Sequence, residues 1–128
     1  MEEKKYKILI IEDEAVFRLI YRGVLESHNY QVFEAENGLI GWEIAKAEQP
    51  DLILLDLILP ELSGFEVLEK IRGHERTYNI PVIVFSVMGN EENIDKATAL
   101  GANYYRVKGA NSPTDILKEI DEVLKNAN

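Results

Sequence analysis

The stretch from Leu52 to Leu59, LILLDLIL, is the most apolar run of the chain, and a single carboxylate, Asp56, interrupts it. A run this short cannot cross a bilayer and suits a strand that is covered on both faces, as in a parallel sheet. Burying an ionised carboxylate without a partner costs several kcal/mol or forces it to take up a proton. The pattern therefore predicts that Asp56 lies at the carboxyl end of the strand and reaches a polar crevice.

Apolar runs alternate with helical spacing along the whole chain, which indicates repeated strand and helix units. Strands are predicted at residues 7–11, 30–35, 52–59, 82–86 and 103–107, with a helix after each of them. The side chains expected to face inward are Val16, Ile20, Gly23 and Val24 in the first helix and Ile40, Ile44, Ala45 and Ala47 in the second.

The polarity of the five runs predicts their positions in one sheet. Runs 7–11, 52–59 and 82–86 are continuously apolar and belong in the centre, whereas 30–35 and 103–107 are mixed and belong at the edges. Right-handed crossovers then give the strand order 2-1-3-4-5. The sequence thus predicts an α/β fold, a doubly wound five-stranded parallel sheet with five helices. It is expected to form one domain over residues 1–128, with no output domain in this chain.

The overall composition excludes several classes of function. With 128 residues, 46% of them hydrophobic, the chain can bury a substantial core, and without cysteine it can form neither disulfides nor thiolate metal sites. A net charge of −9 argues against nonspecific binding to nucleic acid or to an anionic membrane. The amino-terminal MEEKKYK lacks the apolar stretch of a secretory signal, so a cytoplasmic location is expected.

Polar residues end four of the predicted strands and would meet at one rim of the sheet. Glu12 and Asp13 follow the first strand, Asp56 the third, Ser86 ends the fourth and Lys108 follows the fifth. Converging carboxylates repel one another unless a cation lies among them, and oxygen ligands without His or Cys favour Mg²⁺. Asp56 is then predicted to be a nucleophile toward a phosphoryl group, whose oxygens would contact the Lys108 ammonium and the Ser86 hydroxyl.

Two motifs identify a family. Glu12 and Asp13 form an acid pair after the first strand, and residues 56–64, DLILPELSG, have the pattern D-x-x-x-P-x-x-x-G. With the polar strand ends, they make the whole chain resemble a response-regulator receiver domain of two-component signalling, of the single-domain, chemotaxis-regulator-like kind. The resemblance implies the flavodoxin-like receiver fold and makes Asp56 the phosphoacceptor. It also implies that Asp13, Asp56 and the backbone carbonyl of Ile58 are ligands of Mg²⁺, with Glu12 acting mostly through water.

The resemblance assigns roles to the other strand ends as well. Ser86 matches the family's hydroxyl switch residue, Tyr105 the aromatic residue that rotates with it, and Lys108 the invariant lysine. In the family, a histidine kinase or phosphotransfer protein donates phosphate to the Asp, and the two switch side chains then swing inward. This remodels the face formed by the fourth helix, fifth strand and fifth helix, which binds a downstream protein.

Such a domain is expected to be a signalling phosphoacceptor, which catalyses only its own phosphorylation and dephosphorylation and is not otherwise an enzyme. By the same resemblance, its partners would be proteins. The net charge of −9 and the lack of a recognition helix argue against direct contact to nucleic acid, and the charge argues against a membrane. A phosphorylation-dependent dimer stays open.

Two sites depart from the family pattern. The family usually has a cis proline after the lysine, where this chain has Gly109. A cis bond before a non-proline residue costs roughly 2.5 to 4 kcal/mol, so a trans 108–109 bond is expected. Ile58 and Met88 lie two residues after the phosphoacceptor and the switch hydroxyl, where the family often carries polar groups that assist an attacking water. These apolar side chains predict slow self-dephosphorylation.

Most of these residues, taken alone, also have a structural explanation. Acids at 12–14 favour the start of a helix, Ser86 could be an ordinary strand-end hydroxyl, and Lys108 a solvated lysine. Tyr105 could equally be an edge-strand aromatic, like Tyr104. Glu14 is assigned the purely structural role of favouring the start of the first helix. His28 and His74 are expected on the surface near helix ends, and Trp42 is expected to pack a helix, with proximity to the partner surface left open.

Three other functions suit the same architecture. A flavodoxin-type FMN carrier needs a first loop that cradles a phosphate, which Glu12, Asp13 and Glu14 would repel. An aspartate-nucleophile phosphatase would need a second Asp where this chain has Ile58. The third alternative is a receiver-like interaction module that no longer uses phosphate, and the Gly109 departure motivates it.

Overall fold

The computed structural model describes residues 5–125 and contains five strands and five helices that alternate along the chain. The strands are β1 (Lys7–Ile11), β2 (Gln31–Ala35), β3 (Leu52–Leu55), β4 (Val82–Ser86) and β5 (Tyr104–Val107). The helices are α1 (Ala15–Ser27), α2 (Gly38–Glu48), α3 (Gly64–Arg72), α4 (Glu91–Ala99) and α5 (Pro113–Lys125). The strand predicted over 52–59 therefore ends early, and Asp56 follows its last residue.

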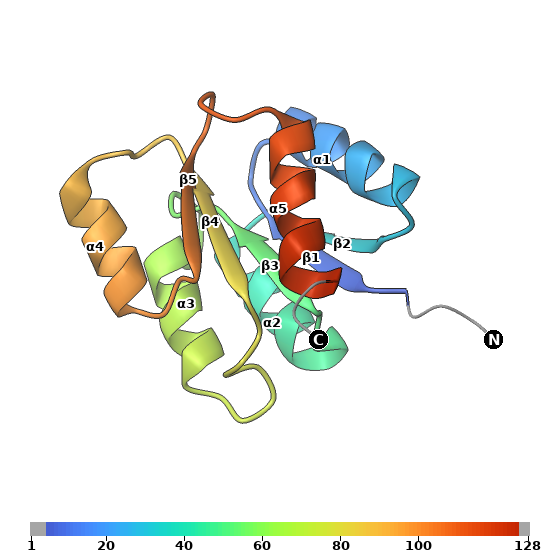
Figure 1. The fold of residues 1–128 in the computed structure, drawn as a ribbon. Helices are drawn as coiled ribbons and strands as arrows, with labels where there is room; N and C mark the ends of the chain where they lie inside the picture. The colour runs from blue at the N-terminus through green and yellow to red at the C-terminus, as the bar shows by residue number, and fades with distance from the viewer. Residues whose placement is uncertain (1–4, 126–128) are drawn as a thin grey trace.

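The five strands form one parallel sheet with the order β2-β1-β3-β4-β5, which confirms the predicted topology (Figure 1). Ile11, the last residue of β1, is the register partner of Leu55, the last residue of β3. The residues that follow, Glu12 and Asp56, therefore start side by side at the carboxyl edge of the sheet. Open α/β sheets bind their ligands at such an edge, outside the point where the strand order reverses.

Helices lie on both faces of the sheet (Figure 1), and each face carries its own cluster of buried apolar side chains. Helices α1 and α5 cover one face, where they pack on Ile8, Ile10 and Leu54, and α2, α3 and α4 cover the other. Because β3 is buried on both faces, every side chain in it is apolar. None of the helices within residues 5–125 has the length and apolar character needed to span a bilayer.

The predicted inward face of α1 was wrong in part. Val16 is 68% exposed and Ile20 is also exposed, whereas Tyr21 and Leu25 are buried with Phe17 half-buried beside them. Both stripes have helical spacing, and the one with more aromatic area faces the sheet because it buries more apolar surface. In α2 the exposed residues likewise include Ile40 and Ala47, and the buried ones are Gly38, Gly41, Trp42 and Ala45.

Candidate functional site

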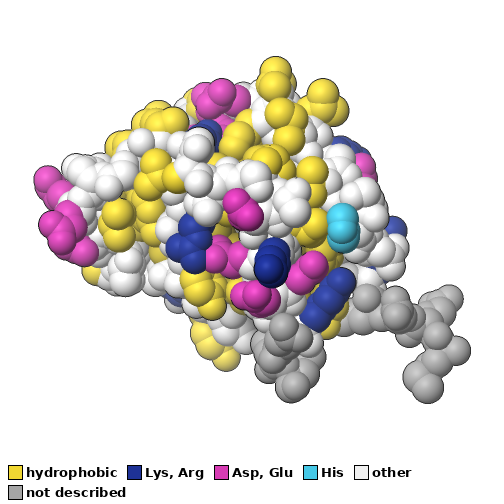
Figure 2. Space-filling view, turned by 45° about the horizontal axis from the view of Figure 1, so that its top comes forward, with side chains coloured by type: hydrophobic (Ala, Val, Ile, Leu, Met, Phe, Trp, Pro, Cys, Tyr) yellow, Lys and Arg dark blue, Asp and Glu magenta, His cyan; other side chains and the backbone are white. Residues whose placement is uncertain are grey.

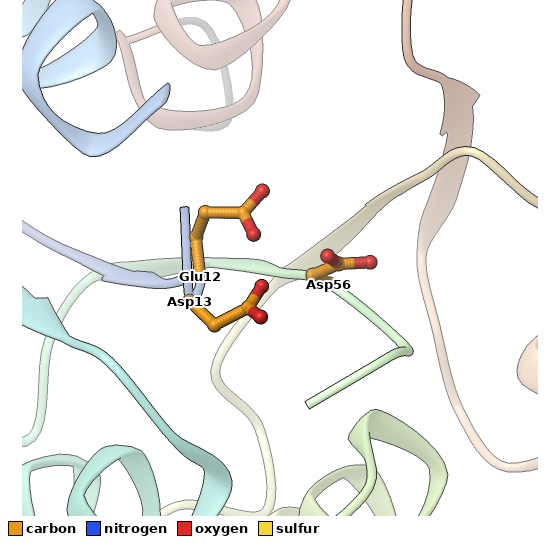
Figure 3. Close-up of side chains that lie close together, drawn as sticks. All are labelled: Glu12, Asp13 and Asp56. Atoms are coloured by element: carbon orange, nitrogen blue, oxygen red, sulfur yellow. The ribbon is translucent and has the colours of Figure 1, made fainter. Parts of the chain in front are cut away.

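Three carboxylates gather where β1 and β3 end. The sheet's hydrogen bonding continues past both strands, because Glu12 N donates to the carbonyl of Ala35 and Asp56 N to that of Ile11, each at 3.0 Å. One oxygen each from Glu12, Asp13 and Asp56 lies within 4.8 Å of the other two (Figure 3). Glu12 and Asp56 are buried, and Asp13 is exposed. The backbone of the sheet therefore brings these acids together.

The loop after Asp56 is packed against the start of α3. Gly64 N donates to the carbonyl of Leu57 at 2.9 Å, and a Cβ on Gly64 would lie 2.2 Å from the carbonyl oxygen of Asp56. Only glycine allows the helix to approach this backbone so closely. Ser63 and Glu66 cap the same helix end reciprocally. The glycine of the D-x-x-x-P-x-x-x-G motif thus has a packing role beneath Asp56.

Lys108 reaches the acids from the end of β5. Its backbone N–H donates to the carbonyl of Ser86 at 2.9 Å, which extends the β4–β5 pairing by one residue. The ammonium forms an ion pair with Glu12 and lies 3.2 Å from Asp56 Oδ2 and 3.4 Å from Glu14 Oε1. The Lys108 side chain is only 10% exposed. Viewed toward this edge, basic and acidic side chains lie next to each other among apolar ones (Figure 2).

Burial and charge perturb the ionisation of this group. Burial raises the pKa of Glu12 to about 7, the Asp56 carboxylate adds to the rise, and the Lys108 ammonium offsets part of it. Burial alone would lower the pKa of Lys108, but the carboxylates of Glu12 and Asp56 outweigh it and raise that pKa. The ammonium of Lys108 therefore stays protonated among these carboxylates, and its positive charge offsets part of their mutual repulsion.

Ser86 and Tyr105 lie beside the acids and are connected through Met88. Ser86 is fully buried, and its Oγ accepts a hydrogen bond from Met88 N at 3.3 Å. The Tyr105 hydroxyl donates to the carbonyl of Met88, and burial raises the pKa of this tyrosine. Among the hydrogen bonds found within residues 5–125, those of the Ser86 hydroxyl do not include one to Asp56.

The two departures from the family pattern lie on the rim. Ile58 N donates to Asp56 Oδ1 at 3.3 Å, and its side chain is 53% exposed; Met88 is half-buried. The bond between Lys108 and Gly109 is trans, as predicted, and Gly109 has a φ of +88°. This left-handed backbone explains why glycine occupies the position.

The other assigned residues fall outside the acid cluster, with one exception. Trp42 is buried and its ring packs edge-on against His74, and His28 is exposed at the end of α1. Glu14 precedes α1 at the N-cap position, but its carboxylate also lies near Lys108. The purely structural role predicted for Glu14 was therefore incomplete.

Sequence reasoning missed two residues of α1 that contact the site. The Lys108 ammonium lies over the ring of Phe17, 4.5 Å from its centroid. Arg18 donates to the carbonyl of Glu12 at 2.6 Å and pairs with Glu34 on β2, 3.3 Å away. The i, i+4 spacing of the aromatic residues at 17 and 21 could have indicated that this side of α1 faces the site. The aliphatic stripe of α1 has the same helical spacing and was chosen in its place.

Comparison with known proteins decides the family. A model of the response regulator receiver domain matches residues 8–121. This chain belongs to that family. The receiver domain is 36% identical over 118 residues to the phosphate regulon transcriptional regulatory protein PhoB of Pseudomonas aeruginosa, covering 92% of this chain and 51% of PhoB.

Solved structures give the same result. The receiver domain superposes on the CheY-like response regulator receiver domain protein of Methanospirillum hungatei with a TM-score of 0.88 and 28% identity, covering 96% of each chain. It superposes on the phosphorylated cyanobacterial phytochrome response regulator RcpA with a TM-score of 0.85 and 33% identity, covering 98% of each. The predicted family and receiver fold are therefore confirmed.

The chain spans about half the length of the curated relatives that it matches. It covers 51% of PhoB and 48% of the transcriptional regulatory protein SrrA of Staphylococcus aureus, to which it is 34% identical. The similarity therefore concerns the receiver domain and not the rest of those regulators.

Proposed function

We propose that this receiver domain accepts a phosphoryl group on Asp56 in a two-component phosphorelay. The observation that carries the proposal is the contact of the Lys108 ammonium, 3.2 Å from the Asp56 carboxylate, at the rim where Glu12 and Asp13 also converge. A nearly buried carboxylate with a cation beside it suits nucleophilic attack on an anionic phosphoryl group, because the cation offsets the negative charge that arrives.

The donor set fits Mg²⁺. Three carboxylates whose oxygens lie within 4.8 Å of one another form a hard, oxygen-only group without histidine or cysteine. We assign Asp13, Asp56 and the carbonyl of Ile58 as ligands, with Glu12 acting through water because its carboxylate already pairs with Lys108. When bound, Mg²⁺ would supply positive charge toward the phosphoryl oxygens.

The residues of the chain have distinct roles in the transfer. An oxygen of ionised Asp56 forms a bond to phosphorus while the bond from phosphorus to the donor imidazole breaks, and the electron pair of that bond leaves with the imidazole. The Lys108 ammonium donates to one phosphoryl oxygen, and the Ser86 hydroxyl, whose oxygen accepts a hydrogen bond from Met88 N, donates its own hydrogen to another. The product is an acyl phosphate on Asp56, so the domain's catalysis is limited to gaining and losing this group.

The partners follow from that chemistry. We assign a histidine kinase or phosphotransfer protein as donor and a downstream protein as target. The face formed by α4, β5 and α5 would change with the positions of Ser86 and Tyr105, since Tyr105 lies on β5 and bonds to the β4–α4 loop at Met88.

The phosphate-independent alternative loses its motivation. It rested on Gly109, which placed the approach of Lys108 to the phosphoacceptor in doubt. With a trans bond at 108–109, the lysine side chain still reaches Asp56. The phosphoacceptor function is therefore favoured.

The proposal is tested by incubation with acetyl phosphate, with and without Mg²⁺, followed by intact mass spectrometry. The wild type should gain one phosphoryl group only when Mg²⁺ is present, and Asp56→Asn should gain none. Asp51→Asn is the matched control, because Asp51 precedes β3 at the opposite edge of the sheet, and it should behave as the wild type does. Failure of the wild type with acetyl phosphate and with a phosphorylated histidine kinase would contradict the proposal.

A further inference from the structure

The Lys108 ammonium contacts both carboxylates and an aromatic ring. It forms ion pairs with Glu12 and Asp56, and it lies over the ring of Phe17, 4.5 Å from the centroid. The lysine side chain is only 10% exposed, so water screens these contacts little. Attraction of an ammonium to the face of an aromatic ring strengthens when both are desolvated.

The ring of Phe17 is itself fixed by two other aromatic residues. It stacks on Tyr21 with centroids 4.4 Å apart and planes 18° apart, and it packs on Phe85 with centroids 5.1 Å apart. Tyr21 and Phe85 also contact each other edge-on, at 5.4 Å. Phe85 lies on β4 directly before Ser86. The ring therefore presents a defined face toward the ammonium.

The side chain of Lys108 can place its charge in more than one position. The backbone around it is held, because Lys108 N donates to the carbonyl of Ser86 and Ala110 N to that of Val107. A lysine nevertheless has four flexible methylenes between its backbone and its charge. The surroundings of the ammonium therefore decide where the charge lies.

We propose that Phe17 is a positioning residue for phosphoryl transfer to Asp56. This inference rests on the proposed function. The ring keeps the Lys108 ammonium in the crevice while the ammonium exchanges Glu12 for a phosphoryl oxygen. A carboxylate competes with a phosphoryl group for the directed N–H bonds of the ammonium, whereas an aromatic face attracts its charge without taking one of those bonds. The contact with Phe17 can therefore persist through the transfer.

The direct test replaces Phe17 with phenylalanines that carry one, two and three fluorines. Fluorination withdraws the negative charge from the ring face and changes the ring's size little. With acetyl phosphate and Mg²⁺, the maximal phosphorylation rate should fall stepwise, reaching about fivefold to tenfold with Phe17→Leu. The donor concentration at half-maximal rate should stay constant, and Phe17→Tyr should keep a rate near that of the wild type. A rate indifferent to fluorination overturns the proposal.

Val24→Ala is the matched control for packing. Val24 is a half-buried residue of α1 that packs against the same apolar cluster as Phe17. The control should lower stability in urea and leave the maximal phosphorylation rate unchanged. If it slows phosphorylation as much as Phe17→Leu does, the effect comes from loosened packing of α1, and the positioning role is overturned.

An NMR measurement distinguishes the positioning role of Phe17 from the phosphoacceptor function on which it rests. Protons next to the Lys108 ammonium lie over the Phe17 ring, so its ring current should shift their NMR signals upfield, and Phe17→Leu should abolish that shift. A wild type that is phosphorylated without showing the shift overturns the Phe17 role alone. A wild type that takes up no phosphoryl group overturns the phosphoacceptor function, and the role of Phe17 with it.

Discussion

The two halves of the site are held in place in different ways. The acid half consists of Glu12, Asp13 and Asp56, and the switch half consists of Ser86, Tyr105 and Lys108. The acid half follows β1 and β3, neighbouring strands inside the sheet, and backbone hydrogen bonds of 3.0 Å hold Glu12 and Asp56 in line with them. In the switch half, Ser86 is buried at the end of the interior strand β4. Tyr105 lies on β5 and Lys108 follows it, and β5 is an edge strand whose side chains are exposed or half-buried.

The switch half has more freedom to move than the acid half. Short acidic side chains on a buried backbone have few alternative positions. In the switch half, the positions of the functional atoms depend on contacts between side chains and loops, such as the bond of Tyr105 to Met88 and the contact of Lys108 with Phe17. We therefore expect changes in the switch half to alter rates more than folding.

The largest expected effect is on folding, in the strand beneath the acid half. Leu54 on β3 is 2% exposed, so Leu54→Ala should lower the free energy of unfolding by about 2 to 5 kcal/mol through lost burial and a cavity. Val107 on β5 is half-buried, and Val107→Ala should cost about 1 kcal/mol. Urea unfolding of both variants measures the difference. If both variants lost the same free energy of unfolding, β3 would not be held more firmly than β5.

The next effect is on the rate of phosphorylation. Lys108→Met removes the cation that contacts Asp56 and should slow phosphorylation by acetyl phosphate about a hundredfold, as removal of a single charge-stabilising donor does in other active sites. Lys118→Met changes an exposed lysine of α5 and should leave the rate unchanged. If Lys108→Met is phosphorylated as fast as the wild type, then Lys108 does not take part in phosphoryl transfer.

A smaller effect concerns the lifetime of the phosphorylated form. Ile58→Asn and Met88→Glu each introduce a polar group on the rim that can orient a water, and each should speed phosphate loss roughly tenfold, less than a fully placed general base would. The decay of the phosphorylated protein after donor removal, followed by intact mass, measures this. If neither variant accelerates the decay, apolar side chains at these positions are not what limits it.

The smallest effect is expected for the hydroxyl of Tyr105. Tyr105→Phe removes its hydrogen bond to the carbonyl of Met88 and should cost about 1 kcal/mol in urea unfolding. Tyr104→Phe, at the exposed neighbouring position of β5, should cost nothing measurable. An equal effect of the two variants would show that the Met88 contact does not stabilise the loop.

The sequence was most informative where backbone geometry places a residue. The apolar runs of β1, β3 and β4 fixed the strand order, and the strand order put Glu12 and Asp56 at neighbouring strand ends. The contacts of long side chains were harder to predict from the sequence. The inward face of α1 was assigned to Val16 and Ile20, because two apolar stripes satisfied the same period. With that stripe chosen, the contact of Phe17 with Lys108 could not be anticipated.

The position of the acyl phosphate can be located directly, without any mutation. The wild-type domain is phosphorylated with acetyl phosphate and Mg²⁺ and treated with borohydride, which reduces an acyl phosphate to an alcohol, and the reduced residue is found by tandem mass spectrometry. If Asp56 is the phosphoacceptor, we expect reduction at Asp56 alone. Reduction at Asp13 or Glu12, the other members of the cluster, would contradict it.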